Sequence, residues 1–471
     1  MENFEFERKR KKRLKKEPIY IFVCILCLVL GACGGYIYSQ GKFPFVSKGS
    51  SNIYEEVGNL IENDFLDTTD SDMSVEERML NGMILALQDP HTSYLSSQDA
   101  IDLSTSINGS FEGIGVTFIQ VDAGALIMDV YKGTPANKAG LLQGDIITHV
   151  EGTSIAGYSS DKIKNTIQGE RGTQVSMKIL RNGKSQDIVC ARGSVETSVN
   201  YEIRDQVGYL GITTFGDSTS KLIEEGLKAF KSKGIENIVI DLRGNGGGYL
   251  NAATDILNFF LPEGSIMFKV QYKDKSEKVY KASQQDKYTF TNGFILVDNN
   301  TASASEVMSA SLKENLGYKI IGETTYGKGT AQVQHTLSNS SVVKYTNAKW
   351  LTPHDTWINE KGIEPDYPVE STTLDDFKIT SMKEDYRYDD VDNHVLSMQE
   401  MLKELGYQVD REDGYFSKKT EEALKAFEKD YGLTVNGIYE KNDATILLSA
   451  LTYHIYHLED SVYQKAVSLI K

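Results

Sequence analysis

The stretch GFILVDNNTASASEV, residues 293–307, decides how the central part of this 471-residue chain folds. It begins with a short apolar run typical of a buried strand and continues into ASEVMSASLKENLG (304–317), which has helical spacing and ends at a glycine. Strand and helix signals alternate in the same way over residues 198–378. This alternation predicts an α/β domain with a mainly parallel sheet.

The flanking segments have different patterns, so the chain is predicted to be a multidomain α/β protein. Short alternating strands separated by glycine turns over 99–197 predict a compact β-rich module. The remaining segments comprise a basic stretch (1–18), an apolar segment (19–39), a helical segment (40–98), a charged linker (379–390), a small all-α domain (391–452) and a C-terminal amphipathic helix (453–471).

The N-terminal segments predict attachment to a membrane. Residues 19–39 hold 21 residues without a charge, enough to span a bilayer, and the basic run RKRKKRLKK (8–16) precedes them. The positive-inside rule then places residues 1–18 in the cytosol and the body of the chain outside the cell. Two alternatives remain open: a cleaved signal peptide, and a lipoprotein whose lipid is attached to Cys33 of LGAC.

Charge and cysteine content exclude several kinds of partner and site. The net charge is −16 despite the basic N-terminus, which argues against a nucleic-acid partner. Of four cysteines, Cys24, Cys27 and Cys33 lie in the apolar segment and only Cys190 lies in the body. The body therefore has no internal disulfide and no cysteine-based zinc site, and no metal or other cofactor is expected.

Ser303 is a candidate nucleophile because it lies at the turn between the strand and the helix. A serine at such a turn is presented at the edge of the sheet, where the helix N-terminus supplies unpaired N–H groups and positive potential. A developing oxyanion requires both. The alternative is structural: TASAS is an N-cap cluster in which Ser303 or Ser305 caps the helix.

Lys328 in YGKGTAQ (326–332) is a candidate general base for such a serine. An apolar pocket would lower the pKa of its amine, and Gln332 could orient that amine without adding a negative charge. His335 is a rival base, although a surface strand position suits it better. Gly322 to Lys328 also resembles a phosphate-binding loop, but Gly329 stands where a Ser or Thr would bind magnesium.

The glycine cluster in DLRGNGGG (241–248) follows another buried-strand pattern, NIVI. Glycines there allow backbone N–H groups to approach a ligand closely and to form half of an oxyanion hole. A plain tight turn explains the same residues equally well.

Taken together, TASASEV, YGKGTAQ and IDLRGNGGG resemble the motifs of the carboxyl-terminal processing peptidases, a family with a crotonase-like core. That family has a serine in S-A-S-E, a lysine in G-K-G 25 residues later and a glutamine four residues further, as here. The resemblance extends over about residues 50–370 and includes DPHTSYL (89–95). It implies a Ser303–Lys328 dyad, Gln332 as the residue that orients the lysine, and backbone oxyanion donors at Gly247 and Ala304. Gly246 departs from the family's N-P-G-G.

Residues 99–197 resemble a PDZ domain, since GTPANKAGLLQGDIITHVEGTSI (133–155) is typical of its strand, helix and turn. The resemblance places the carboxylate-binding loop at Gly113, Ile114, Gly115 and Val116. Such a groove binds an extended peptide by strand addition. Arg171 is a candidate sensor of the peptide's carboxylate, or alternatively a solvated turn residue.

Residues 391–452 resemble a peptidoglycan-binding domain, which implies a cell-wall glycan as ligand; a structural or homodimer-forming role is the alternative. The whole chain is thus expected to be a membrane-anchored extracytoplasmic serine endopeptidase that cleaves polypeptides near their C-termini. It also resembles versions from spore-forming bacteria that cut signalling proteins. The alternatives are a catalytically silent PDZ and cell-wall-binding scaffold, or a cell-wall adaptor with secondary peptidase activity.

Overall fold

The computed structural model describes residues 52–470 except 68–72, 109, 132, 182, 197, 284–286, 371, 373, 379–381 and 456–459. The expected membrane segment, 19–39, lies outside these residues. Among the helices that are described, none is long and apolar enough to cross a membrane. The chain divides into two units after Ala86, and each is described by itself.

The first unit contains two helices, α3 (Asn52–Asp64) and α4 (Val75–Leu85), in the segment where helix was predicted. Helix α4 begins with a capping box, in which the Ser74 hydroxyl accepts from the backbone N–H of Glu77 and the Glu77 carboxylate accepts from the N–H of Ser74.

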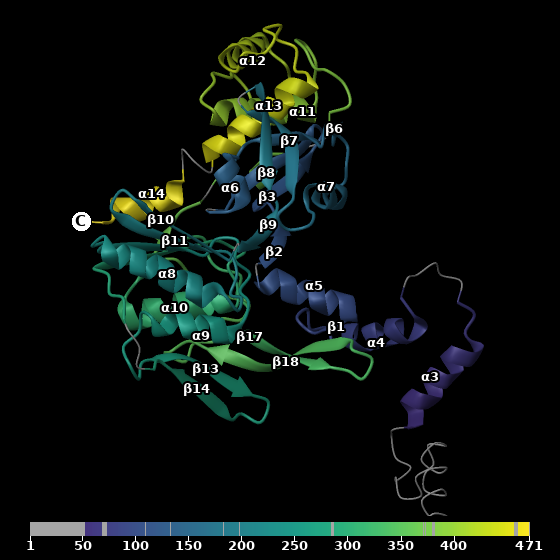
Figure 1. Cartoon of the computed structure of the whole chain (residues 1–471), viewed down its shortest axis with the longest axis vertical. Helices are drawn as coiled ribbons and strands as arrows, with labels where there is room; N and C mark the ends of the chain where they lie inside the picture. The colour runs from purple at the N-terminus through teal and green to yellow at the C-terminus, as the bar shows by residue number, and fades with distance from the viewer. Residues whose placement is uncertain are drawn as a thin grey trace, which may run out of the picture. The chain divides into compact units, whose positions relative to one another are not determined.

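The second unit begins with β1 (Ser93–Leu95), α5 (Ser97–Asn108) and the β-rich module (Figure 1). In the module's sheet the strands run in the order β3-β4-β5-β7-β8, with β6 beside β5. Helices α6 and α7 accompany this sheet, and β2 pairs with β9. The bounds are β2 (Ser110–Gly113), β3 (Val116–Val121), β4 (Gly124–Val130), α6 (Pro135–Ala139), β5 (Ile146–Val150), β6 (Thr153–Ser154), α7 (Ser160–Ile167), β7 (Gln174–Arg181), β8 (Lys184–Ala191) and β9 (Gly193–Glu196).

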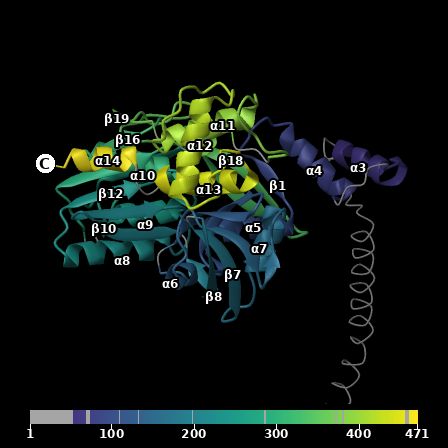
Figure 2. The same ribbon diagram turned by 90° about the horizontal axis from the view of Figure 1, so that it is seen from above.

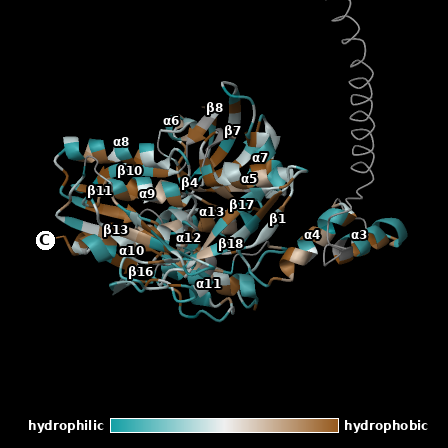
Figure 3. Ribbon diagram, turned by 90° about the horizontal axis from the view of Figure 1, so that it is seen from below, coloured by the Kyte–Doolittle hydropathy of each residue, from teal (hydrophilic) through white to brown (hydrophobic). Residues whose placement is uncertain are grey.

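The α/β domain confirms the predicted mainly parallel sheet. Its order is β10-β11-β12-β15-β16-β19, antiparallel only between β10 and β11. Figure 3 shows the alternating hydropathy of α8, whose apolar side joins the main core. The bounds are β10 (Val199–Arg204), β11 (Val207–Ile212), α8 (Thr219–Ser232), β12 (Asn237–Asp241), α9 (Leu250–Asn258), β15 (Asn292–Val297), α10 (Ala304–Leu316), β16 (Lys319–Gly322) and β19 (Tyr367–Pro368).

A second sheet is attached to this domain. Its strands run in the order β1-β18-β13-β14, and β17 forms an antiparallel hairpin with β18. Residues of β13 and β18 share the main core with α8, α9 and α10. The bounds are β13 (Ile266–Tyr272), β14 (Glu277–Lys281), β17 (Thr330–Thr336) and β18 (Val342–Leu351).

The C-terminal part of the chain contacts both preceding domains. After a 3-10 turn at Leu374–Asp376, helices α11 (Asn393–Glu404), α12 (Lys418–Asp430) and α13 (Lys441–Tyr453) enclose an apolar core that also includes Leu126 and Ile146 of the β-rich module. In place of one helix over 453–471, α13 ends at Tyr453 and a separate α14 spans Ser461–Ser468.

Helix α14 returns to the α/β domain. Its Val462, Tyr463 and Ala466 pack on one face of the parallel sheet, against side chains that include Val239 and Leu296. Figure 2 shows α8 and α14 on opposite sides of β10 and β12. The sheet is buried on both faces because side chains alternate along each strand: neighbouring Ile238 and Ile240 belong to the other core.

Candidate active site

Ser303 lies between β15 and α10, as the sequence predicted for a strand-to-helix turn. Its backbone has φ +57° and ψ −115°, which is unfavourable for any residue with a side chain. The neighbouring Ser305 is fully buried, and its hydroxyl donates to the carbonyl of Asn245 at 2.9 Å. Only Ser303 of the two therefore lines the cavity.

That cavity has a volume of about 590 Å³ and brings together side chains from distant parts of the sequence. Ser303, Lys328 and Gln332, the three candidate catalytic residues, all line it. The rest of the wall comes from three elements. Helix α5 contributes Ser106 and Ile107, the loop after β12 contributes Gly246, Gly247 and Gly248, and β18 contributes Lys344 and Trp350.

Glu306 connects the serine turn to the lysine loop, a role that our reading of the sequence missed. Its fully buried carboxylate accepts from the backbone N–H groups of Ser303 at 2.8 Å and Lys328 at 2.9 Å. The N–H of Gly327 and the hydroxyl of Thr325 donate to it as well. Burial raises the pKa of Glu306, and these four hydrogen bonds oppose that effect. A glutamate three residues after a serine at a helix start is the signal that could have revealed it.

The surroundings of Lys328 favour a neutral amine. Burial lowers the pKa of this lysine, and the nearby charge of Lys344 lowers it further, while Asp89 and Glu306 act in the opposite direction. Gln332 has its amide nitrogen directed to the hydroxyls of Thr330 at 3.0 Å and Thr346 at 3.1 Å. The same amide's oxygen remains as an acceptor.

The glycine loop is packed so closely against the serine turn that position 247 must be glycine. Gly247 has φ +102°, and a Cβ there would lie 2.8 Å from the carbonyl oxygen of Ala302 and 2.9 Å from the Cβ of Ser303. Its N–H donates to Oδ1 of Asn245 at 2.8 Å. Ala304 begins α10, so its N–H is one of the first-turn N–H groups that have no acceptor within the helix.

Asn245 holds this loop in place and is a second residue that the sequence did not single out. It is fully buried, and its amide nitrogen donates to the carbonyl of Ile212 at 2.8 Å. Its own carbonyl accepts from the N–H of Ala302 and from the hydroxyl of Ser305.

A second cavity of about 640 Å³ lies between β3 and α7 of the β-rich module. All four residues of the predicted carboxylate loop, Gly113 to Val116, line it, together with Lys164 and Ile167 of α7. Ser106 of α5 lines both this groove and the Ser303 cavity. Arg171 is exposed and lies outside the lining of the groove.

Other predicted positions lie apart from this chemistry. His335 is exposed on β17 and does not line the Ser303 cavity. No group of three or more His, Cys, Asp or Glu side chains among the described residues is arranged to hold a metal ion.

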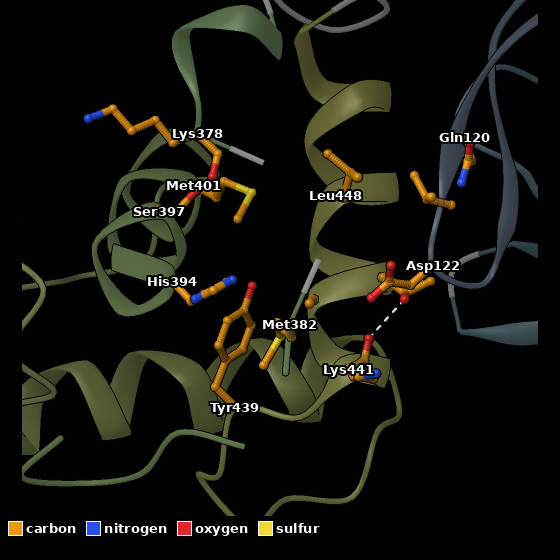
Figure 4. A pocket seen from close by; sticks show the side chains of 13 residues that line it. Gln120, Asp122, Lys378, Met382, His394, Ser397, Met401, Tyr439, Lys441 and Leu448 are labelled. Atoms are coloured by element: carbon orange, nitrogen blue, oxygen red, sulfur yellow. Dashed lines mark hydrogen bonds between the residues drawn. The ribbon is translucent and has the colours of Figure 1, made fainter. Parts of the chain in front are cut away.

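The C-terminal domain has a hollow of its own, about 250 Å³, between α11, α13 and the end of β3. Figure 4 shows His394 and Tyr439 beside the sulfur-containing side chains of Met382 and Met401, while the amine of Lys378 points away. Its lining combines polar and apolar side chains.

Comparisons with known proteins agree with this architecture. The family model for peptidase family S41 matches residues 206–369, a PDZ domain model matches 113–190, and a peptidoglycan binding domain model matches 392–445. The chain is 33% identical over 435 residues to the carboxy-terminal processing protease CtpA of Bacillus subtilis (strain 168), covering 92% of this chain and 91% of that protein. The chain belongs to peptidase family S41.

Two further similarities complete the comparison. Identity to the carboxy-terminal processing protease CtpB of Bacillus subtilis (strain 168) is 34% over 400 residues, with 83% of each chain covered. The solved photosystem II D1 C-terminal processing protease aligns with a TM-score of 0.41 at 24% identity, over 68% of this chain and 87% of that one.

Family membership confirms the resemblance read from the motifs. This S41 peptidase is a serine-type peptidase that carries a PDZ domain and a domain of the peptidoglycan-binding family. Hereafter, the β-rich module is called the PDZ domain and the α/β domain is called the peptidase domain.

Replacing Glu306 by glutamine should weaken the connection between the serine turn and the lysine loop. Glu306→Gln keeps the shape but directs an NH2 group at backbone N–H donors, so we expect a loss of about 2–3 kcal/mol in the free energy of unfolding. Both tryptophans, Trp350 and Trp357, lie in the peptidase domain, so urea unfolding followed by tryptophan fluorescence reports on it directly. The exposed Glu364 provides the control, Glu364→Gln, which should change nothing. Equal stability of the two variants would contradict the role of Glu306.

Proposed function

We propose that this S41 peptidase is a membrane-anchored endopeptidase that cleaves polypeptides near their C-termini, with Ser303 as nucleophile and Lys328 as general base. The observation that carries the proposal is that Ser303, at the start of α10, lines one cavity with Lys328 and Gln332 of the segment 326–332. The lowered pKa of Lys328 supports its role, because only a neutral amine can accept the serine proton.

The proposed reaction has two halves. In the first, the Lys328 amine takes the proton of the Ser303 hydroxyl as Oγ attacks the peptide carbonyl carbon. The tetrahedral intermediate collapses, the C–N bond breaks, and Lys328 returns the proton to the leaving amine. In the second, Lys328 takes a proton from a water molecule that attacks the acyl-enzyme, and Ser303 leaves with its proton restored.

The oxyanion of each intermediate is assigned to the backbone N–H groups of Gly247 and Ala304. The close packing of Gly247 on the serine turn supports this assignment. The Gly247 N–H donates to Asn245 in the structure, so the oxyanion must share or replace that acceptor. At Gly246, where the family has proline, an added Cβ would meet no other atom within 4 Å, and glycine restricts the backbone less than proline would.

Substrate capture is assigned to the groove of the PDZ domain. An extended tail can add as a strand beside β3, with its carboxylate near the backbone of the Gly113–Val116 loop. Ser106 lines both cavities, which supports a path for the polypeptide along α5 from the groove to Ser303.

A serine-directed fluorophosphonate probe tests the dyad without knowledge of the substrate. We expect the probe to label Ser303, and we expect Lys328→Ala to slow labelling about a thousandfold, since general bases contribute on that order. Absence of labelling in the unaltered protein would instead favour the catalytically silent scaffold.

The pH dependence of labelling should follow deprotonation of Lys328. Because its pKa is lowered, the rate should rise with a midpoint below 10.5, the ordinary value for lysine. Lys344→Gln removes a positive charge that disfavours the protonated amine, so the midpoint should move to higher pH. The matched control is Lys349→Gln on the same strand, outside the cavity lining; a midpoint unchanged by Lys344→Gln would refute the charge effect.

The groove should prefer a free C-terminal carboxylate, and Lys164 is the cation in its lining. Lys164→Gln should weaken binding of a fluorescent peptide with a free carboxylate about fivefold, corresponding to about 1 kcal/mol. The amidated peptide should show no such loss. The control is Lys162→Gln, because that amine lies over the Tyr158 ring instead. Fluorescence anisotropy measures both; equal effects of the two substitutions would exclude carboxylate recognition by Lys164.

The uncharged segment 19–39 and the basic run before it support a membrane anchor. The full-length chain should therefore sediment with membranes, resist carbonate extraction and retain its N-terminus by mass spectrometry. Cys33→Ser leaves this behaviour unchanged for a signal-anchor and abolishes lipid labelling for a lipoprotein. A soluble full-length chain would rule out both.

A further inference from the structure

The segment Asp89–Thr92, which precedes β1, lies against the catalytic hairpin although it is more than 200 residues away in sequence. Strand β1 pairs antiparallel with β18, placing Ser93 opposite Lys344 and Tyr94 opposite Val343. Strand β18 also pairs with β17, which carries Gln332. The segment thereby reaches the strand that lies beside Gln332.

A β-bulge interrupts the pairing of β17 with β18 beside Gln332. Along β17 and β18, Ala331 is opposite Ala348, but the next residue, Gln332, is opposite Thr346, so Asn347 is unmatched. A bulge changes the direction of the neighbouring side chains. Here the Gln332 amide nitrogen donates to the Thr346 hydroxyl at 3.1 Å and to the Thr330 hydroxyl at 3.0 Å.

The buried Thr92 hydroxyl continues the hydrogen bonds toward Asp89. It donates to Oδ2 of Asp89 at 2.6 Å and accepts from the backbone N–H of Thr346 at 3.0 Å. A threonine hydroxyl has one hydrogen, so the bond to the carboxylate leaves a lone pair directed at Thr346. Asp89 is itself fixed, because its other oxygen accepts from the N–H of His91 at 3.0 Å.

We propose that Asp89, Thr92 and Thr346 are positioning residues for the peptidase reaction: they hold the Gln332 carboxamide so that its oxygen faces the amine of Lys328. The inference rests on the dyad of the proposed function. Both hydrogens of the Gln332 amide nitrogen are used by threonine hydroxyls, so its oxygen is the atom left to orient the lysine.

Asp89 has a second effect because it bears charge close to the lysine. The charged and titratable groups around Lys328 come from three places: Asp89 and His91 before β1, Lys344 on β18, and Glu306 on α10. Burial, followed by the charge of Lys328, lowers the pKa of His91 and so favours its neutral ring. Asp89 thus opposes both burial and Lys344, so removing its charge should lower the pKa of Lys328 further.

The two effects can be separated with two variants of the full-length protein. Thr92→Val removes the hydroxyl at nearly constant volume, so Gln332 loses its support. The maximal rate of fluorophosphonate labelling should fall at least tenfold, and Thr92→Ser should restore most of it. Asp89→Asn removes the charge; its one oxygen can still accept from Thr92, while the hydrogen bond from the His91 N–H is lost. Its maximal rate should stay within about twofold, while the midpoint of the pH profile moves to lower pH.

The matched control is Thr166→Val on α7, whose hydroxyl donates only to the Lys162 carbonyl in its own helix. Its labelling rate and pH profile should not change. Tryptophan fluorescence shows whether the peptidase domain of each variant is folded. If Thr92→Val does not fold, Thr346→Val, which removes the hydroxyl that accepts from the Gln332 amide, takes its place and should also lower the maximal rate at least tenfold.

Labelling of Thr92→Val at the rate of the unaltered protein would overturn the positioning role, and an unshifted pH profile in Asp89→Asn would overturn the charge effect of Asp89; the dyad stands in both cases. If the unaltered protein is not labelled, the dyad itself fails and the inference fails with it.

Discussion

The site depends most on one buried carboxylate. Glu306 accepts hydrogen bonds from the serine turn and from the lysine loop, so it fixes two backbone segments that the sequence separates by more than twenty residues. A carboxylate can serve several donors at once, and when they are backbone N–H groups it holds the chain itself. The strained backbone of Ser303 persists because the structure around it is fixed in this way.

Other hydrogen bonds and strand pairs hold the remaining parts of the site. Asn245 joins the glycine loop to Ile212 of β11 and to the serine turn. The β17–β18 hairpin brings Gln332 and Lys344 to the cavity, and β1 pairs with β18 of this hairpin. The backbone N–H groups of Ser303 and Lys328 are thus held by Glu306, and the amide nitrogen of Gln332 is held by two threonine hydroxyls, which positions these residues before a substrate arrives.

The C-terminal part of the chain contacts both the PDZ domain and the peptidase domain. The core of the C-terminal helical domain includes Leu126 and Ile146 of the PDZ sheet. Farther along, α14 returns to the peptidase sheet, where Asp460 pairs with Arg243 at 2.8 Å. Arg243 also pairs with the buried Asp241, directly before the glycine loop. The residues after the helical domain are therefore part of the peptidase core.

The sequence by itself determined the fold class, the family and the candidate residues Ser303, Lys328 and Gln332, because alternating apolar patterns and fixed motif spacing are local properties of the chain. It also predicted a carboxylate-binding loop at Gly113 to Val116, and the structure places these residues in the lining of a groove. It could not reveal that Glu306 and Asn245 hold the site, that the Gly247 N–H is occupied, or that Thr92 reaches the hairpin. These depend on contacts between segments that are distant in sequence, and only tertiary packing decides which buried polar groups meet.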